Sequence, residues 1–544
     1  MLFPRSFLYV LLGTLLLAVG LVVGFKLADY TPANTPENQL SKFEEVVDFV
    51  NATYFERPDN AALIDNAIQG MLEGLDPHSF YIPAAEMKAM DEQMHGEFEG
   101  IGIEFNLLDD TLYVVSALSG GPSEKLGITS GDRIVKIDGV NVAGVGLTNS
   151  DVVKKLRGPK GTQVKVSIKR PGLRNPLEFT IVRDKIPMHS VDYSYMVNDN
   201  VGYIRVSRFA EKTFMEFIEH LNRLKRQGLK NLILDLRGNP GGYMFQAQEM
   251  ADAFLKKNKL VVYTKGRVPE SNSSYESTNA IAGWEEGGLI ILIDQGSASA
   301  SEIVSGAVQD WDRGLIVGTR SFGKGLVQTQ KKLSDGSAVR IVISRYYTPS
   351  GRCIQKPYTK GKKAYEEEIY ERIENGELVD PGKVKFPDSL KYKTHAGRTV
   401  YGGGGIMPDV FVPRDTSGTS EYLSKLILNG TFNRFSLRWL EQHPNLKAEY
   451  PTWREYLNRF RPQPEMIQAL VAFAKEKGIA YNDADFKTSE RYIRNNLKAA
   501  LGRALYNDDG FFPVLLQEDE TFRRALELMP QAIVLERTGK FTLK

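Results

Sequence analysis

The run Leu289-Ile290-Ile291-Leu292-Ile293 constrains the fold of this chain more than any other feature of its sequence. It is apolar at every position, so a strand formed by it is buried on both faces, which is typical of a parallel sheet. A second buried strand is expected at 231–236, and strand and helix patterns alternate from residue 201 to residue 346. The middle of the chain is therefore predicted to be a layered α/β domain.

Small residues follow this strand and contain a candidate nucleophile. The segment Gly296-Ser297-Ala298-Ser299-Ala300-Ser301-Glu302 leads into a helical pattern. At a strand-to-helix turn a hydroxyl can stand clear of the backbone, and unpaired N–H groups at the helix start are available to an anion. The same residues also match a capping box, in which Ser299 and Glu302 only cap the helix. Considered alone, such a serine is more often a cap than a nucleophile.

Lys324 lies 25 residues after Ser299 (324 − 299), and Gln328 follows it. We interpret Ser299 as a nucleophile and Lys324 as its general base. A free lysine has a pKa of about 10.4, but burial can lower that pKa by ~3–5 units. A neutral Lys324 could then accept the Ser299 proton, and Gln328 could hold its amine by a hydrogen bond. Considered alone, Lys324 is more often a solvated turn residue.

Other catalytic patterns are incomplete. The segment 318–324 matches a phosphate loop up to its lysine, but Gly325 stands where magnesium binding needs Ser or Thr, so nucleotide binding is not predicted. The G-x-S-x-G elbow of Ser-His-Asp hydrolases is absent around Ser299. Structural roles are favoured for His78, beside a proline turn, and for Cys353, the single cysteine. No cluster has metal-ligand spacing, so neither a metal nor a cofactor is predicted.

The length of the chain predicts three or four domains, and its amino terminus indicates a contact with a membrane. With 69 Lys and Arg against 67 Asp and Glu, nothing indicates a nucleic-acid partner. Residues 1–30 are predicted to be a membrane anchor or signal segment. The uncharged stretch Phe7–Phe25, at ~1.5 Å per residue, nearly spans a hydrocarbon core of ~30 Å. Arg5 favours a cytoplasmic start with the remainder exported, and no convincing cleavage site follows, so a retained anchor is preferred.

Four further regions complete the predicted organisation. Residues 31–94 are predicted to be helical, 95–184 to form an inserted domain, 185–415 the α/β core, and 416–544 a helical accessory domain. Within the core, the Ser- and Asn-rich stretch 268–283 is predicted to be mobile. The charge-rich stretch 356–380, with a short helix, is predicted to be a surface insertion.

The inserted region 95–184 resembles a PDZ domain of the bacterial protease type. The resemblance rests on three motifs in order: Gly100-Ile101-Gly102-Ile103, Gly131-Asp132-Arg133-Ile134 and Ile137-Asp138-Gly139. The first of them exposes successive N–H groups that can hold a chain-terminal carboxylate, and the adjacent strand edge can accept an extended peptide. An ordinary hairpin with permissive glycines is the alternative.

Over roughly residues 43–409 the chain resembles the carboxyl-terminal processing peptidases, or tail-specific proteases. Six groups of residues carry this resemblance: Gly70–Leu72 with Leu75–Ser79; Phe98–Gly102; Asp235–Gly242; Gly296–Glu302; Phe322–Gly325; and Tyr347–Arg352. The resemblance implies a crotonase- or ClpP-like α/β core with an inserted PDZ domain. It also implies a Ser–Lys dyad of Ser299 and Lys324 assisted by Gln328, and an oxyanion hole formed by the N–H of Ala300 with that of Gly241 or Gly242.

The predicted function is a serine endopeptidase anchored in the bacterial inner membrane, with most of the chain on the periplasmic side. Its PDZ domain would capture exported proteins with free, apolar carboxyl termini; an oligomer is left open. The alternative is a catalytically inactive, peptide-binding PDZ scaffold on a protease-like core. The presence of Ser299, Lys324 and Gln328 together argues against that alternative. Cleavage of a peptide with a free carboxyl terminus, compared with its amidated form, distinguishes the two.

Overall fold

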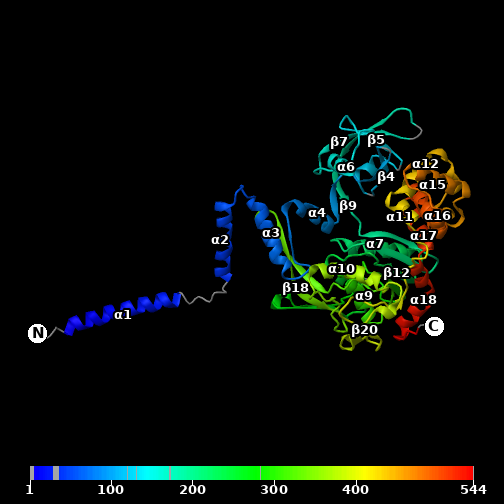
Figure 1. Ribbon diagram of the computed structural model, residues 1–544. Helices are drawn as coiled ribbons and strands as arrows, with labels where there is room; N and C mark the ends of the chain where they lie inside the picture. The colour runs from blue at the N-terminus through cyan, green and yellow to red at the C-terminus, as the bar shows by residue number, and fades with distance from the viewer. Residues whose placement is uncertain are drawn as a thin grey trace. The chain divides into compact units, whose positions relative to one another are not determined.

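The computed structural model describes residues 5–28, 36–108, 110–118, 120–129, 131–170, 173–281 and 283–542. The chain divides into two compact units, residues 1–74 and residues 75–544. The second unit contains the α/β core, the inserted domain and the carboxyl-terminal helices (Figure 1).

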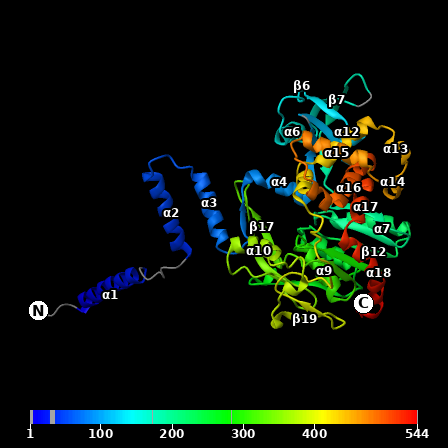
Figure 2. The ribbon, with the colours of Figure 1, turned by 45° about the vertical axis from the view of Figure 1, so that its right-hand side comes forward.

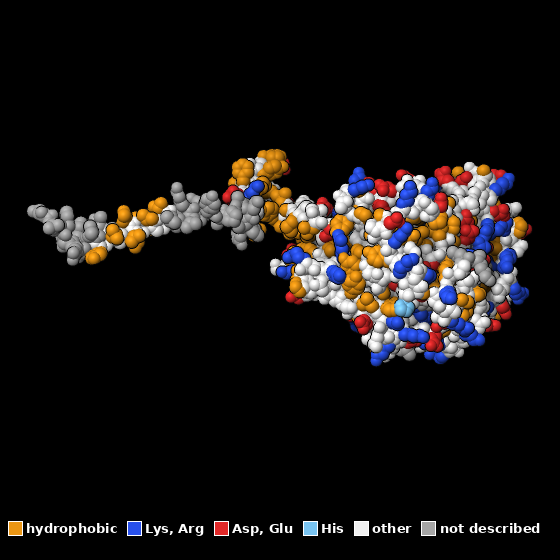
Figure 3. Space-filling view, turned by 90° about the horizontal axis from the view of Figure 1, so that it is seen from below, with side chains coloured by type: hydrophobic (Ala, Val, Ile, Leu, Met, Phe, Trp, Pro, Cys, Tyr) orange, Lys and Arg blue, Asp and Glu red, His pale blue; other side chains and the backbone are white. Residues whose placement is uncertain are grey.

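The described residues of the first unit form three helices, α1 (Arg5–Ala28), α2 (Pro36–Thr53) and α3 (Asn60–Glu73). The helical patterns predicted here are confirmed, but apolar side chains of α2, among them Phe43 and Phe49, are exposed to solvent. Figure 3 shows hydrophobic side chains on the surface of this amino-terminal unit. The predicted anchor Phe7–Phe25 lies within α1, where the side chains of 5–8, 10–11 and 23–28 are outside the described residues. Among the described residues, none of the helices has the length and apolar character that a membrane crossing requires.

A six-stranded sheet forms the centre of the second unit. Its strands, in spatial order, are β10 (Val191–Met196), β11 (Val201–Val206), β12 (Asn231–Asp235), β15 (Gly288–Ile293), β16 (Leu315–Gly318) and β21 (Val410–Phe411). Only β10 runs antiparallel to its neighbour; the other pairs are parallel. The buried strand predicted at 289–293 is therefore confirmed as a central parallel strand.

Both faces of β15 are covered, as its unbroken apolar run requires. On one face, Leu289, Ile291 and Ile293 join a core that includes residues of α7 (Thr213–Arg226), α8 (Met244–Asp252) and α9 (Ala300–Asp310). On the other face, Ile290 and Leu292 pack against α18 (Glu520–Thr538). The last helix of the region predicted as a separate accessory domain thus belongs to the core.

A second sheet lies beside this core. Its strands are β1 (Phe80–Ile82), β18 (Ala338–Tyr347), β13 (Leu260–Gly266) and β14 (Ser273–Glu276), with β17 (Leu326–Lys332) paired to β18. Within the stretch 268–283, which the sequence predicts to be mobile, Ser273–Glu276 form β14, and this strand pairs antiparallel with β13. Ser273 also contacts Thr264, whose Oγ1 accepts the Ser273 N–H at 2.8 Å.

The inserted region folds as a small antiparallel β domain. Its strands, in order, are β3 (Ile103–Leu108), β4 (Thr111–Ala117), β5 (Arg133–Ile137), β7 (Gln163–Lys169) and β8 (Leu177–Val182), with β6 (Val140–Asn141) beside β5 and helices α5 (Pro122–Lys125) and α6 (Asn149–Leu156). The chain enters through β2 (Glu97–Gly100) and leaves through β9 (Asp184–Pro187), which pair with each other. Strand β3 is an edge strand, as a peptide-accepting strand must be.

The carboxyl-terminal region is helical, as predicted. Its helices are α11 (Glu421–Leu428), α12 (Thr431–Gln442), α13 (Leu446–Glu449), α14 (Trp453–Arg459), α15 (Pro464–Glu476), α16 (Asp483–Tyr506) and α17 (Asp508–Gln517), and they share a hydrophobic core of their own. Figure 2, like Figure 1, shows α12 and α16 next to the inserted domain. Two ion pairs join these parts: Arg503 of α16 with Glu104 of β3 at 2.9 Å, and Arg133 of β5 with Glu441 of α12.

The Arg503–Glu104 pair is expected to help hold the inserted domain in place. Exposed ion pairs contribute about 0.2–1 kcal/mol, so Glu104→Arg and Arg503→Glu should each broaden the distribution of distances between spin labels on α12 and β7. The double variant restores the pair with reversed charges and should narrow that distribution again. Lys165→Glu, an exposed change on β7, is the control. A double variant as broad as the single variants would contradict this role.

Candidate active site

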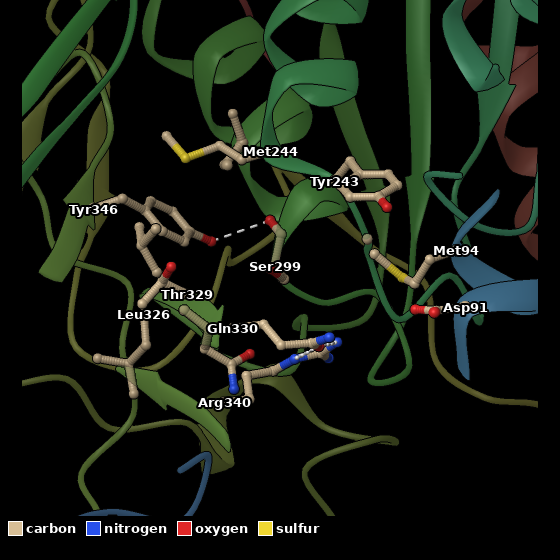
Figure 4. A pocket seen from close by; sticks show the side chains of 14 residues that line it. Asp91, Met94, Tyr243, Met244, Ser299, Leu326, Thr329, Gln330, Arg340 and Tyr346 are labelled. Atoms are coloured by element: carbon tan, nitrogen blue, oxygen red, sulfur yellow. Dashed lines mark hydrogen bonds between the residues drawn. The ribbon is translucent and has the colours of Figure 1, made fainter. Parts of the chain in front are cut away.

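Ser299 lies between the end of β15 and the start of α9 and has an unusual backbone conformation, with φ 53° and ψ −109°. Serine rarely adopts a positive φ, and a helix-capping residue normally has an extended backbone. Such strain costs about 1–3 kcal/mol and persists only where the surroundings impose it. Here the Ser299 N–H donates to the Glu302 carboxylate at 2.8 Å, and its carbonyl accepts the Tyr346 hydroxyl at 3.1 Å (Figure 4).

Glu302 connects the Ser299 turn to the turn that carries Lys324. Its buried carboxylate also accepts the N–H groups of Gly323 at 2.7 Å and Lys324 at 2.9 Å, and the hydroxyl of Ser321 at 2.5 Å. Burial raises the pKa of Glu302, and these donors oppose that shift because they favour the ionised form. Sequence reasoning considered Glu302 only as a capping residue and missed this second role.

Tyr346 of β18 joins the same two turns from the other side. Its side chain is buried, and its hydroxyl lies between the carbonyl of Ser299 at 3.1 Å and that of Lys324 at 2.8 Å, both of which are acceptors. Burial raises the pKa of Tyr346 well above its usual value, so the hydroxyl stays protonated. No local sequence signal marked Tyr346, because its importance depends on the pairing of β18 with the rest of its sheet.

The glycine loop after β12 contacts the Ser299 turn directly. Asn239 is fully buried, and its side chain accepts the Gly241 N–H at 2.9 Å while its carbonyl accepts the Ala298 N–H at 3.0 Å. A Cβ on Gly241 would lie 2.8 Å from Ser299 Cβ and 2.9 Å from the Ala300 nitrogen. Only glycine permits this approach, and the φ of 98° at Gly241 also favours glycine.

Gly241 and Gly242, the two glycines predicted as alternatives for the oxyanion hole, differ in the hydrogen bonding of their N–H groups. The Gly241 N–H is occupied by Asn239. Among the hydrogen bonds of the described residues, the N–H groups of Gly242 and Ala300 have no protein acceptor. Gly242 also lines the pocket that contains Ser299. Gly242 and Ala300 are therefore the pair whose N–H groups remain available to a bound oxyanion.

Lys324 contacts Gln328, as expected, and through it His78. The Lys324 amine donates to Gln328 Oε1 at 3.0 Å, and Gln328 Nε2 donates to the carbonyl of His78 at 2.5 Å. The His78 ring shares a hydrogen bond of 2.8 Å with the Tyr365 hydroxyl, and burial followed by the charge of Lys324 lowers its pKa to about 4. His78 therefore supports the site with its backbone, in agreement with the structural role favoured from the sequence.

The electrostatic environment favours an uncharged Lys324. Burial is the first cause that lowers the pKa of Lys324, and the positive charge of Arg340 is the second; Glu302 and Asp76 act in the opposite direction. No hydrogen bond links the Lys324 amine to the Ser299 hydroxyl among the described residues. The two residues are nevertheless held on adjoining turns, because Glu302 and Tyr346 each contact both.

A pocket of about 360 Å³ opens onto Ser299 (Figure 4). Its walls come from α4 (Ala84–His95), the start of α8, β17 and β18, with Asp91, Tyr243 and Arg340 among the lining side chains. Strand β17 pairs with β18 alone among the described strands, so its other edge is open along this pocket. Lys324 is partly buried and is not among the lining residues.

The charge-rich stretch 356–380, predicted to be a surface insertion, is mostly exposed but also contacts the site. Its helix α10 (Lys362–Glu374) carries two buried side chains, Tyr365 and Arg372. Arg372 donates to the carbonyls of Ser321 at 2.8 Å and Phe322 at 3.0 Å, in the turn that precedes Lys324. The charge-rich sequence did not reveal this contact, because the carbonyl groups that Arg372 binds come from a distant segment of the chain.

The predicted peptide-binding residues lie where β2 meets β3. Ile101 is buried, and its carbonyl accepts the Ser123 hydroxyl at 2.6 Å. Gly102 has a φ of 71°, and Gly100 and Ile103 lie at the end of β2 and the start of β3. The loop is thus placed at the end of the edge strand β3, with a conformation that favours glycine.

Comparison with protein families assigns most of the chain. Residues 200–361 match peptidase family S41, and residues 113–170 match a PDZ domain. Residues 26–86 match the amino-terminal domain of the activating protease CtpB, and residues 422–507 match a family of unknown function.

Individual relatives agree with these matches. The carboxy-terminal-processing protease of Bartonella bacilliformis is 37% identical over 415 residues, which cover 76% of this chain and 92% of that protein. The carboxy-terminal processing protease CtpA of Bacillus subtilis is 35% identical over 365 residues, 66% of this chain and 74% of that protein. Among solved structures, the photosystem II D1 C-terminal processing protease is 26% identical, with a TM-score of 0.35 over 70% of this chain and 88% of that one.

Gly241→Ala should displace the Ser299 turn, because its Cβ would meet Ser299 and Ala300 at less than 3 Å. A misplacement of a reacting group by about 1 Å can reduce its reactivity by about 100-fold. We therefore expect an organophosphonate probe to label Ser299 about 100-fold more slowly in Gly241→Ala than in the wild type. Gly238→Ala is the matched control: Gly238 also has a positive φ, 68°, but a Cβ there would meet nothing within 4 Å. Equal labelling rates in both variants would contradict this account.

Arg340→Gln should raise the pKa of Lys324, because it removes the positive charge that helps to lower it. If Lys324 must be neutral to activate Ser299, the rate of Ser299 labelling rises with pH through the pKa of Lys324. The midpoint of that profile should then move to higher pH in Arg340→Gln. Arg345→Gln, an exposed arginine of the same strand β18, should leave the midpoint unchanged. A midpoint that does not move in Arg340→Gln would exclude this coupling.

Proposed function

Because this chain belongs to peptidase family S41, the serine proteases that process carboxyl termini, we propose that Ser299 and Lys324 are its catalytic dyad. One observation carries the proposal: Ser299 lines the pocket in a strained conformation, while Glu302 fixes it to the turn of a partly buried lysine with a lowered pKa. Perturbed pKa values and strained backbones both gather at functional sites.

The proposed reaction is acyl transfer through the serine hydroxyl. Neutral Lys324 removes the proton of Ser299 Oγ as the oxygen attacks the scissile carbonyl carbon, and the carbonyl oxygen becomes an oxyanion. The N–H groups of Ala300 and Gly242 stabilise this charge, an effect worth about 3–4 kcal/mol per donor. The Lys324 ammonium then gives its proton to the leaving amine, and water hydrolyses the ester on Ser299 by the same steps.

Lys324 must change its contacts for this reaction to begin. In the structure its amine donates to Gln328, and catalytic hydrogen bonds are often unformed before substrate binds. The lysine side chain is flexible, whereas its backbone is held by Glu302 and Tyr346. A rotation of the side chain alone would therefore bring the amine to Ser299, with Gln328 and the His78 carbonyl defining the resting position.

The proposed substrates are proteins with free, apolar carboxyl termini. The edge strand β3 and the glycine loop 100–103 would bind the end of such a tail, and the open edge of β17 would hold the segment to be cleaved in an extended form. Both contacts would use main-chain hydrogen bonds, so an unfolded tail is the form that fits.

We also propose that the protease acts on exported proteins on the periplasmic side of the inner membrane, tethered by its amino terminus. The support is in the sequence: Phe7–Phe25 contains no charged residue and is flanked by Arg5 and Lys26. An oligomeric state is not part of the proposal.

Cleavage of a fluorogenic peptide with an apolar carboxyl terminus tests the dyad and the recognition together. Ser299→Ala and Lys324→Met should each lose at least about 1,000-fold in kcat/KM, as expected for the loss of a nucleophile or its base, while still binding the peptide. Amidation of the peptide should weaken binding to both variants and to the wild type. Ser301→Ala is the control and should retain activity. The Ser301 hydroxyl donates to the Asn239 carbonyl at 3.0 Å, and Ser301 does not line the pocket. Wild-type activity in Lys324→Met would remove the lysine from the mechanism.

A further inference from the structure

A second pocket, of about 630 Å³, lies in the carboxyl-terminal helical region and has no part in the site described above. One face of α16 supplies most of its cations, at a spacing that places them in a single row: Lys487, Arg491, Arg494 and Lys498. Arg461, after α14, adds a fifth cation. The pocket has only two carboxylates, Glu490 and Glu518, so its lining carries three net positive charges, more than the +2 of the entire chain.

The two carboxylates are already engaged by neighbouring arginines. Glu490 pairs with Arg494 at 2.7 Å, and Glu518 pairs with Arg491. Within the part of the chain that the structure describes, Arg461 and Lys498 have no carboxylate within 4 Å. The pocket therefore contains two cations without a charged partner.

Lys498 is the more informative of these two cations because it is only 4% exposed. Its amine donates to the carbonyl of Leu457 at 2.7 Å, in the last turn of α14, where a positive charge is favourable. An ammonium has three donors, so this contact leaves two of them unused. Burial and then the charge of Arg461 lower the pKa of Lys498 to about 8, while the charge of Glu518, which forms no ion pair with Lys498, acts in the opposite direction.

A buried cation without an opposite charge is unfavourable, and an anion in the pocket would remove that penalty. The chemistry of the lining selects the kind of anion. Guanidinium groups and an ammonium bind the oxygens of a phosphate group, often through several N–H groups at once. The side chains of Asn495 and Gln517 add neutral hydrogen-bonding groups, and the volume exceeds that of a bare ion.

We infer that this pocket binds a phosphate group, with Arg461, Arg494 and Lys498 as its cationic ligands. The phosphate could be free in solution or be the headgroup of an anionic phospholipid, since both present the same oxygens. The inference is independent of the dyad, because no residue of the pocket contacts Ser299, Lys324 or their supports. It would give the helical region, which matches a family of unknown function, a binding role of its own.

The first arm of the test uses free phosphate. Full-length protein in phosphate-free buffer should unfold at a higher temperature as inorganic phosphate is added, with ionic strength held constant by sodium chloride. Arg461→Gln changes an exposed side chain and should fold normally, and Lys498→Met keeps a long apolar stem in place of the buried amine. Both variants should lose the phosphate-dependent shift. Arg438→Gln, an exposed cation of α12 outside the pocket, should retain it.

The second arm measures co-sedimentation of the same proteins with vesicles of phosphatidylcholine, with and without phosphatidylglycerol. Extra sedimentation with phosphatidylglycerol that is lost in Arg461→Gln and Lys498→Met would identify a lipid headgroup. A thermal shift without this extra sedimentation would identify a soluble phosphate. If the wild type responds in neither arm, or if Arg461→Gln and Lys498→Met respond as strongly as Arg438→Gln, the inference is wrong.

Discussion

The buried carboxylate of Glu302 is the contact on which the active-site region depends. It accepts hydrogen bonds from the backbone of Ser299 and from the turn of Lys324, two segments that belong to different sheets of the protein. A buried carboxylate is costly unless its lone pairs are satisfied, and here four donors satisfy them. The same hydrogen bonds therefore stabilise the buried carboxylate and fix the relative positions of the two turns that carry the proposed dyad. Tyr346 reinforces the arrangement by joining the carbonyls of the same two residues.

The central sheet explains why this arrangement can be rigid. Strand β15 is buried on both faces, by α8 and α9 on one side and by α18 on the other, so its end is a fixed point from which the Ser299 turn projects. The glycine loop after the neighbouring strand β12 then reaches the turn closely enough to exclude any side chain at Gly241. A strained backbone at Ser299 is tolerated because rigid elements surround it. In the proposed dyad, Lys324 has the longer side chain, and its amine is held by Gln328.

The carboxyl-terminal helices contact both the protease core and the PDZ domain. Helix α18 completes the protease core, while α12 and α16 contact the PDZ domain through Glu441 and Arg503. The contact residue Glu104 lies on β3, the same edge strand whose neighbouring loop would bind a substrate tail. The helical region is thus an integral part of the enzyme. Helix α16 both lines the cationic pocket and contacts the PDZ domain.

Much of the fold was predictable, because hydrophobic periodicity and turn residues are local signals. The apolar run 289–293 predicted a central parallel strand, and the spacing of Ser299, Lys324 and Gln328 within family motifs indicated the candidate dyad before any coordinates were known. Local patterns failed where partners come from distant segments. The serine-rich strand β14 forms because β13 pairs with it, and Arg372 of the charge-rich helix α10 is buried because it donates to carbonyls near Lys324. Local patterns thus established most of the strands and helices and the residues that carry reactive groups. The folded arrangement was needed to show that Glu302 and Tyr346 hold two turns together and that the N–H of Gly242, unlike that of Gly241, has no protein acceptor among the described residues. It was also needed to show that the charge of Arg340 lowers the pKa of Lys324. Hydrogen bonds and charges act between neighbours in space, and the order of residues along a chain does not specify those neighbours.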